Sequence, residues 1–137
     1  MALTVLDASI ALAWCFDDET SSATEALLDE IKVGGAVVPT LWHVELGNVL
    51  LAAERGGRTI QGGVVVRLRL FARLPIEIDF ETSRRAWRQT LVLARAERLT
   101  LYDGAYLELA LRRGLPLATK DYDLAAAAKR VAVPVLP

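Results

Sequence analysis

The sequence predicts an α/β fold in which helices cover both faces of a parallel sheet of short strands. Short apolar runs alternate along the chain with longer stretches of helical periodicity, and this alternation is typical of a parallel sheet. The chain has 137 residues, of which 53% are hydrophobic. That length fits one domain, residues 1–137, with enough apolar side chains to form a core and no tendency to disorder.

The first half of the chain contains two expected strands and three expected helices. The strands are expected at 3–6 and 36–38, and the helices at 9–16, 21–32 and 39–55. Gly34 and Gly35 end the second helix, because glycine is unfavourable inside a helix. Pro39 suits the first turn of the third helix, where its missing N–H needs no partner, and Gly56-Gly57 ends that helix.

The second half contains expected helices at 82–98, 100–113 and 122–130 and expected strands at 75–78, 115–119 and 133–135. Residues 59–74 fit two interpretations. Val66, Leu68 and Leu70 alternate with arginines as in a strand, but the length of the stretch favours a helix. The last strand is expected at an edge of the sheet, because Pro134 lacks the N–H that a central strand donates.

Several classes of protein and of site are excluded at this stage. No apolar run is long enough for a membrane span, and the first residues lack the basic region of a secretory signal. The single cysteine, Cys15, cannot form an intramolecular disulfide, and the single histidine, His43, excludes a site that needs two imidazoles. We therefore expect a cytoplasmic protein whose chemistry depends on carboxylates, hydroxyls, arginine or lysine.

The charge is balanced overall, with a net value of −1, but it is uneven along the chain. Acidic residues dominate the first part, in which Lys32 is the only base, whereas residues 51–98 are rich in arginine. Arginine binds phosphate and carboxylate through a planar fork of donors. The asymmetry therefore hints at an anionic partner, although a codon-usage bias toward arginine explains it equally well.

Four carboxylates are placed so that they can meet. Asp7 follows the first expected strand, and Asp121 follows the strand at 115–119 after a short loop. Glu45 lies about two turns into the helix after the second strand, and Asp103 lies in the first turn of the helix at 100–113. Because ligand sites of such folds lie beyond the carboxyl ends of the strands, we expect all four on one rim of the sheet.

Each aspartate also has a structural explanation. Asp7 and Asp121 are suited to capping helices, and Thr100 with Asp103 has the form of a capping box. Glu45 is harder to explain in this way, because it occupies an apolar helix face without an arginine at a neighbouring position. Clustered acids repel one another, and a fold tolerates them mainly when a divalent cation neutralises them.

A site with only oxygen ligands favours Mg²⁺ or Mn²⁺ over zinc. Such a cation activates water and stabilises charge on a phosphoryl oxygen. The residues alone therefore indicate a metal-dependent phosphodiesterase.

Four segments carry a family resemblance: Val5–Ser9, Glu45–Leu50, Tyr102–Ala110 and Leu117–Asp121. In order and spacing they resemble the motifs of the PIN-domain family, and most closely those of VapC-type toxin ribonucleases from toxin–antitoxin pairs. The resemblance implies a three-layer α/β/α domain and a Mg²⁺- or Mn²⁺-dependent endoribonuclease that cleaves single-stranded RNA with a metal-activated water. It also implies a cognate antitoxin, and either a homodimer or a hetero-oligomer with that antitoxin.

The same resemblance assigns roles to individual residues. Its catalytic acids correspond to Asp7, Glu45, Asp103 and Asp121. Asp7 and Asp103 are the expected direct metal ligands, with contributions from Glu45 and Asp121, and Asp123 is able to share or replace the role of Asp121. Behind the ligands, the supporting residues are expected to be Ser9, Thr119 and Asn48, of which Asn48 orients Glu45.

Two surfaces are expected to bind partners. Arg67 and Arg69 are candidates for contact with RNA, because they lie in the arginine-rich part of the chain. Exposed apolar side chains near the N-terminal helices, such as Trp14 and Phe16, are expected to line a groove for the antitoxin, which would insert arginine or lysine toward Asp7 and Asp103.

Two alternative functions use the same fold. One is an RNA-processing nuclease that is not a toxin, and the other is a degenerate module that binds RNA or protein. The complete set of four acids disfavours the degenerate module. A small open reading frame directly upstream of the gene would indicate a toxin.

Overall fold

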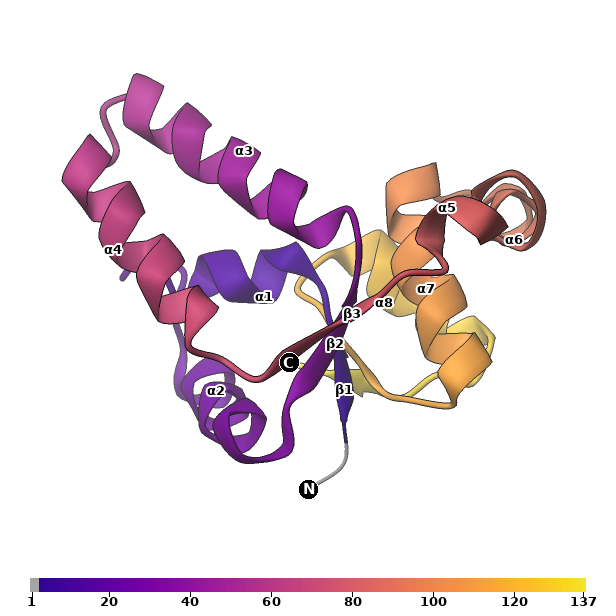
Figure 1. Cartoon of the computed structure of the whole chain (residues 1–137). Helices are drawn as coiled ribbons and strands as arrows, with labels where there is room; N and C mark the ends of the chain where they lie inside the picture. Colours follow the sequence, from indigo (N-terminus) through magenta and orange to yellow (C-terminus); the bar gives the residue numbers. More distant parts are fainter. Residues whose placement is uncertain (1–2) are drawn as a thin grey trace.

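The computed structural model of the chain describes residues 3–137 as a three-layer α/β/α domain (Figure 1). Met1 and Ala2, which the expected domain includes, lie outside the described residues. Five parallel strands form one sheet in the order β3-β2-β1-β4-β5. The strands are β1 (Thr4–Leu6), β2 (Ala36–Pro39), β3 (Ile76–Asp79), β4 (Leu117–Ala118) and β5 (Val135–Leu136). The predicted fold class is confirmed.

Helices cover both faces of the sheet (Figure 1). On one face lie α1 (Ala8–Ala13), α2 (Ser22–Gly34), α3 (Trp42–Arg55) and α4 (Gln61–Ala72). On the other face lie α5 (Thr82–Arg85), the π-helical turn η1 (Ala86–Thr90), α6 (Leu91–Glu97), α7 (Leu101–Arg113) and α8 (Tyr122–Arg130). No helix within residues 3–137 combines the length and apolarity that a membrane crossing requires.

The central strands are buried from both sides, as the apolar runs predict. Val5, Leu6, Val37 and Leu117 are fully buried, and they pack between the inner faces of the helices. Strands that are covered on both faces are uniformly apolar rather than alternating. The core therefore lies in two layers, one on each side of β1 and β2.

Three local expectations were settled by the structure. Residues 61–72 form a helix, α4, as the length of the stretch indicated. Pro39 is not in a helix: it is the last residue of β2, beyond Val37, where the pairing with β1 ends. Its missing N–H therefore breaks no bond to that neighbour. The expected helix at 82–98 is divided into α5, η1 and α6 by the π-helical turn.

Gly104, near the start of α7, allows that helix to lie close to α6. A Cβ atom at this position would lie 2.9 Å from the Cβ of Ala94, which is closer than two carbon atoms pack. The glycine thus fixes the approach of α7, which carries Asp103 and Tyr106.

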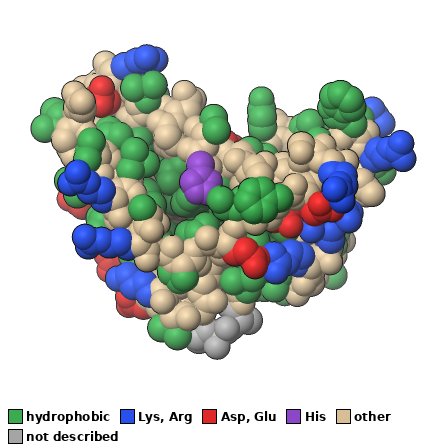
Figure 2. All heavy atoms as spheres, in the orientation of Figure 1, with side chains coloured by type: hydrophobic (Ala, Val, Ile, Leu, Met, Phe, Trp, Pro, Cys, Tyr) green, Lys and Arg blue, Asp and Glu red, His purple; other side chains and the backbone are tan. Residues whose placement is uncertain are grey.

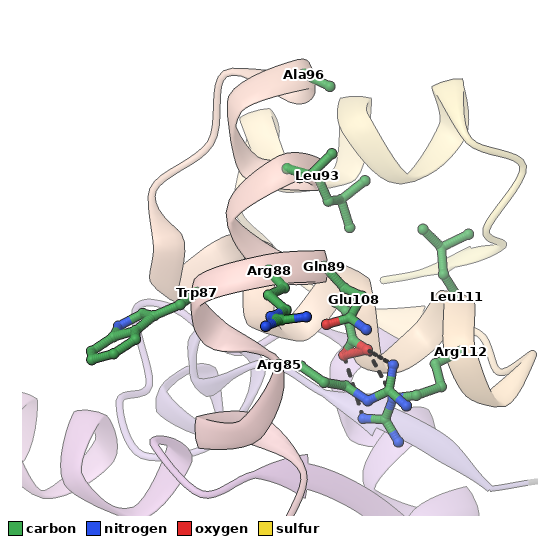
Figure 3. Close-up of a pocket in the computed structure, with 10 residues that line it drawn as sticks. Arg85, Trp87, Arg88, Gln89, Leu93, Ala96, Glu108, Leu111 and Arg112 are labelled. Atoms are coloured by element: carbon green, nitrogen blue, oxygen red, sulfur yellow. Dashed lines mark hydrogen bonds and ion pairs between the residues drawn. The ribbon is translucent and has the colours of Figure 1, made fainter.

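An ion cluster joins the end of β3 to α7. Both oxygens of Asp79 accept hydrogen bonds from the Arg112 guanidinium, at 3.1 and 2.7 Å. Arg112 Nε also donates to Glu108 at 2.8 Å, and Arg85 lies 3.4 Å from the same carboxylate. Figure 3 shows the side chains of Arg85, Glu108 and Arg112 pointing toward one another. Asp79 and Glu108 are buried, so these arginines compensate their charges.

Candidate active site

The strand order places one candidate site between β1 and β4. The chain builds the sheet from β1 toward β3 and then returns to the other side of β1, so the two strands diverge into connections on opposite faces. In open α/β sheets, ligands bind at such a switch point, outside the carboxyl ends of the strands. These ends point upward in Figure 1, toward a depression that the space-filling view shows between the α3–α4 part and the α5–α6 part (Figure 2).

Asp7 lies at this switch point, directly after β1. The residue is 6% exposed, and its Oδ2 accepts hydrogen bonds from Ser9 Oγ at 2.6 Å and from Thr119 Oγ1 at 2.7 Å. Asp7 occupies the N-cap position of α1 but makes no capping hydrogen bond through its side chain. The capping explanation for Asp7 is therefore wrong, and the side chain is instead held by hydroxyls from both neighbouring connections.

The burial of Asp7 disfavours its charged form. Loss of solvation raises the pKa of the Asp7 carboxyl, and the hydrogen bonds from Ser9 and Thr119 lower it in part. The nearby charge of Asp121 raises the pKa further. A cation next to Asp7 would stabilise the ionised carboxylate and so offset both the loss of solvation and the repulsion by Asp121.

Glu45 lies in the first turn of α3, and not two turns into a helix as expected, because Pro39 belongs to β2. Its Oε1 accepts a hydrogen bond from Tyr106 Oη at 2.6 Å. Burial raises the pKa of Glu45, the Tyr106 hydrogen bond opposes that change, and the charge of Asp7 adds to it. The carboxylate therefore has a partner on α7, as its apolar surroundings require.

Tyr106 was missed as a site residue. Asn48 was expected to orient Glu45, but Asn48 is exposed, and the hydrogen bond to the Glu45 carboxylate comes from the fully buried Tyr106. One signal was available in the sequence. Tyr106 follows Asp103 by three residues, so both share one face of the helix that carries them.

The pKa of Asp103 depends on the charges of the other acids at this edge. Its backbone N–H donates to Thr100 Oγ1 at 3.1 Å, which is the threonine half of the expected capping box. Burial raises the pKa of the Asp103 carboxyl to about 6, with further contributions from the charges of Asp121, Asp7, Glu45 and Asp123. These carboxylates, from three separate segments of the chain, are close enough to repel Asp103.

Asp121 caps α8, as its structural explanation proposed. Its Oδ1 accepts a hydrogen bond from the Leu124 N–H at 2.9 Å, and its own N–H donates to Thr119 Oγ1 at 3.0 Å. Thr119 thus links Asp121 to Asp7. Asp123, in the first turn of α8, is exposed.

The acids share a negative field without forming a closed cage. Within residues 3–137, no three acidic, histidine or cysteine side chains are arranged to hold one ion together. Mg²⁺ is commonly held by only one or two carboxylates and keeps several of its waters. The oxygen-only donors, the buried Asp7 and the mutual repulsion fit a hard divalent cation of that kind.

The two candidate arginines for RNA binding differ in their surroundings. Arg67 is half-buried: its Nε donates to the carbonyl of Cys15 at 3.0 Å, and its Nη1 donates to Thr59 Oγ1 at 3.2 Å. Arg69 is exposed on the same helix, α4. Arg67 therefore supports the packing of α4 against the chain after α1, and Arg69 has the freer side chain.

Of the two aromatic residues expected to line a partner groove, only Trp14 lines a cavity of this kind. Phe16 is buried, with the Arg58 guanidinium 3.7 Å from the centre of its ring, so the expectation that it is exposed was wrong. Trp14 is half-buried and donates to the carbonyl of Thr24 at 2.7 Å. It lines a cavity of about 230 Å³ between α1, α2 and α4, together with Leu28, Leu70, Phe71 and Leu74 among others.

The raised pKa of Asp103 predicts how stability and metal affinity depend on pH. The folded state holds the Asp103 proton up to about pH 6, whereas the ordinary pKa of the group is 3.8. The stability that this bound proton contributes is therefore fully present below pH 3.8 and is lost as the pH rises through about 6. Metal binding needs the ionised form, so Mg²⁺ affinity should rise over the same range. Thermal melts with and without Mg²⁺ between pH 4 and pH 8 measure both effects, and an increase in melting temperature with Mg²⁺ that does not change with pH would contradict them.

Comparison with known proteins decides the family. The sequence model of the PIN domain matches residues 4–130. The chain belongs to the PIN-domain family. Comparison of this PIN domain with curated proteins found no sequence match.

Solved structures share the fold of this PIN domain. PAE2754 from Pyrobaculum aerophilum superimposes with a TM-score of 0.68 at 23% identity, over 92% of this chain and 84% of its own. VapC20 from Mycobacterium tuberculosis, described as a toxin that cleaves the sarcin–ricin loop, gives 0.65 at 15% identity, over 92% and 95% of the two chains. FitAcB from Neisseria gonorrhoeae gives 0.58 at 18% identity, over 98% and 96%.

Proposed function

We propose that this PIN domain is the toxin of a toxin–antitoxin pair and an endoribonuclease that cleaves single-stranded RNA with Mg²⁺ or Mn²⁺. The observation that carries the proposal is the gathering of Asp7, Glu45, Asp121 and Asp123 around Asp103, close enough that their charges add to the effect of burial in raising its pKa. An accumulation of acids at the carboxyl edge of a parallel sheet is useful when a cation and a phosphate bind there. The toxin activity described for VapC20, which shares the fold, supports the same class of substrate.

Each side chain would have its own role in such a site. Asp7 and Asp103 would hold the cation, which when bound would lower the pKa of a water and neutralise charge on the phosphate. Ser9 and Thr119 keep the Asp7 carboxylate oriented through their hydrogen bonds. Glu45, whose pKa burial raises and whose position Tyr106 fixes, is suited to accept a proton from the attacking water.

Asp121 and Asp123 add negative charge to the same edge. Asp121 is committed to the cap of α8 through one oxygen, and its second oxygen remains for a contribution to the metal or to its waters. Asp123 is more exposed and is able to replace part of that contribution. We therefore assign these two residues to supporting roles.

An antitoxin is the partner that the apolar cavity between α1, α2 and α4 favours. The cavity is lined by Trp14, Leu28, Leu70, Phe71 and Leu74, among others, and it suits the apolar face of a helix or extended peptide. A chain that continued from there to the acidic edge would inhibit the enzyme by presenting arginine or lysine to Asp7 and Asp103. A complex in which the partner leaves this edge open to solvent would contradict such inhibition.

RNA contact is expected to depend on Arg69. Arg69→Glu should weaken binding and lower the slope of log affinity against log salt by about 0.7 for each lost phosphate contact with a single strand. Its melting temperature should stay near that of the wild type, whereas Arg67→Glu should also lower it because two hydrogen bonds are lost. Arg95→Glu, on α6 across the sheet, is the control for a general charge effect. Equal slopes of log affinity against log salt for all four proteins would show that α4 does not contact RNA.

Cleavage by the purified protein tests the proposed function. The wild type is incubated with a panel of structured RNAs in Mg²⁺ or in EDTA, and the ends of the products are mapped. We expect cuts in single-stranded regions with Mg²⁺ and none with EDTA. Cleavage that persists in EDTA would contradict the role of the metal, and RNA that binds but is never cut would favour the degenerate binding module.

A further inference from the structure

A pocket opens directly beside Glu45, between α3 and the first turn of α7. Its volume is about 420 Å³. The residues that line it are Leu41, Val44, Glu45, Asn48, Val49 and Tyr102. Because Glu45 forms part of the wall, the pocket is continuous with the acidic edge and lies within one side chain of the proposed chemistry.

The helical spacing of α3 explains how the pocket forms. Trp42, Leu46 and Leu50 are buried on one face of the helix. Residues three and four positions from Glu45, which include Asn48 and Val49, lie together on another face. This face turns toward the pocket rather than toward the core.

Several apolar groups of the pocket are left exposed. Val44 is 74% exposed and Tyr102 is 64% exposed, although both are close to a catalytic acid. A cluster of exposed apolar side chains with polar groups at its rim is typical of a binding site. The amide of Asn48 is also exposed here, so the pocket offers one donor and one acceptor beside its apolar walls.

The chemistry of these walls selects the kind of ligand. A phosphate would be repelled by the ionised carboxylate of Glu45, which lines the pocket. An unpaired base has apolar faces and a polar edge, and proteins bind such bases by stacking them on aromatic rings and by hydrogen bonds to the edge. The exposed Tyr102 ring and the Asn48 amide supply these two kinds of contact.

We infer that this pocket binds an unpaired nucleobase of the RNA, with Tyr102 stacking on its face and Asn48 bonding to its edge. The inference rests on the proposed function, because it takes the RNA at the acidic edge as the source of the base. Asparagine pairs with adenine through one donated and one accepted hydrogen bond. The pocket therefore makes adenine the preferred base next to the cleaved bond.

Binding of short single-stranded RNAs tests this without relying on cleavage. Fluorescently labelled oligomers of A and of C are titrated in Mg²⁺ against Asp7→Asn protein, which carries the pocket intact, and the dissociation constants are measured by anisotropy. Tyr102→Ala should raise the Kd by about five- to 150-fold, the usual effect of one lost stack, and Tyr102→Phe should restore most of the affinity.

Asn48→Asp tests recognition of the edge. A carboxylate can only accept hydrogen bonds, so this variant can still accept from the adenine N6 amino group but can no longer donate to N7, and it should lose the preference for A over C. Gln89→Ala, which removes an exposed amide from η1 on the other side of the sheet, should leave the A-to-C ratio unchanged. Cleavage-site mapping with Asn48→Asp in the otherwise wild-type protein should show the same loss of preference for A.

The outcomes separate this inference from the proposed function. Equal affinities and equal A-to-C ratios in all variants, or no RNA binding at all, would overturn the inference. The same holds if Tyr102→Ala changes the mass of the protein in sedimentation but not its RNA binding, since the pocket would then contact another protein chain. A base preference that depends on Tyr102 and Asn48, in a protein that never cleaves RNA, would support base binding by the pocket and contradict the proposed nuclease activity.

Discussion

Asp7→Asn is expected to reduce RNA cleavage by about 10²–10³-fold, the usual effect of removing one electrostatic stabiliser from an active site. Asparagine has nearly the size of aspartate, and its side-chain oxygen can still accept the hydrogen bonds that Ser9 and Thr119 donate to Asp7. Only the negative charge and its affinity for a cation are lost. Initial cleavage rates of a single-stranded RNA in Mg²⁺ measure the effect.

The same variant should fold at least as well as the wild type. Burial and the charge of Asp121 raise the pKa of Asp7, so the ionised side chain lowers stability at neutral pH in the absence of metal, and the neutral amide does not. The melting temperature without metal should therefore be unchanged or higher. The increase that Mg²⁺ produces should be smaller in this variant, because ligand binding stabilises in proportion to affinity.

Expression in growing cells gives an independent readout. The wild type should arrest growth when it is expressed alone, and neither Asp7→Asn nor Asp103→Asn should do so. Asp121→Asn should have a weaker effect, since asparagine still caps α8 and Asp123 lies nearby. Growth arrest by a well-folded Asp7→Asn protein would exclude cleavage as its cause and favour a binding function.

Arg112→Ala is expected to destabilise the domain by about 3–5 kcal/mol, because removal of one partner leaves a buried charge uncompensated. Asp79 and Glu108 would both lose their main counter-charge, and of these two carboxylates Arg85 pairs with Glu108 and not with Asp79. The cluster joins the edge strand β3 to α7, which carries Asp103. Urea unfolding at neutral pH measures the change in the free energy of unfolding.

Arg113→Ala is the matched control for this variant. Arg113 is the next residue, and it pairs with Glu77, whose side chain is 53% exposed. An exposed pair of this kind contributes at most about 1 kcal/mol. Equal losses of stability in the two variants would show that the Arg112 cluster has no special role in joining β3 to α7.

The parts of the fold that local patterns determine were predictable from the sequence. Apart from β3, in which Glu77 and Asp79 alternate with isoleucines, the strands are short and largely apolar, and the position of Asp7 directly after the first of them identifies the edge at which a site is expected. The boundary at Pro39 was misplaced because a proline is compatible with the first turn of a helix and equally with the end of a strand. The distinction depends on pairing with β1, which ends at Val37.

The missed features depend on residues that are far apart in the sequence. Tyr106 and Glu45 are separated by 61 positions, and Arg112 and Asp79 by 33. No periodicity or spacing connects such pairs, because their contact depends on how helices pack across the sheet. Arg67 is another example, since its donors are used by Cys15 and Thr59, and only the packed structure shows that.

Asp7 and Asp103 are proposed to hold one divalent cation together. The most direct measurement is anomalous diffraction from crystals soaked in Mn²⁺ above pH 6, where the Asp103 carboxyl, with its pKa of about 6, is ionised. We expect an anomalous peak bonded to carboxylate oxygens of both residues, and no peak there in Asp103→Asn crystals. Mn²⁺ bound elsewhere, or no peak between two well-ordered carboxylates at saturating Mn²⁺, would contradict it.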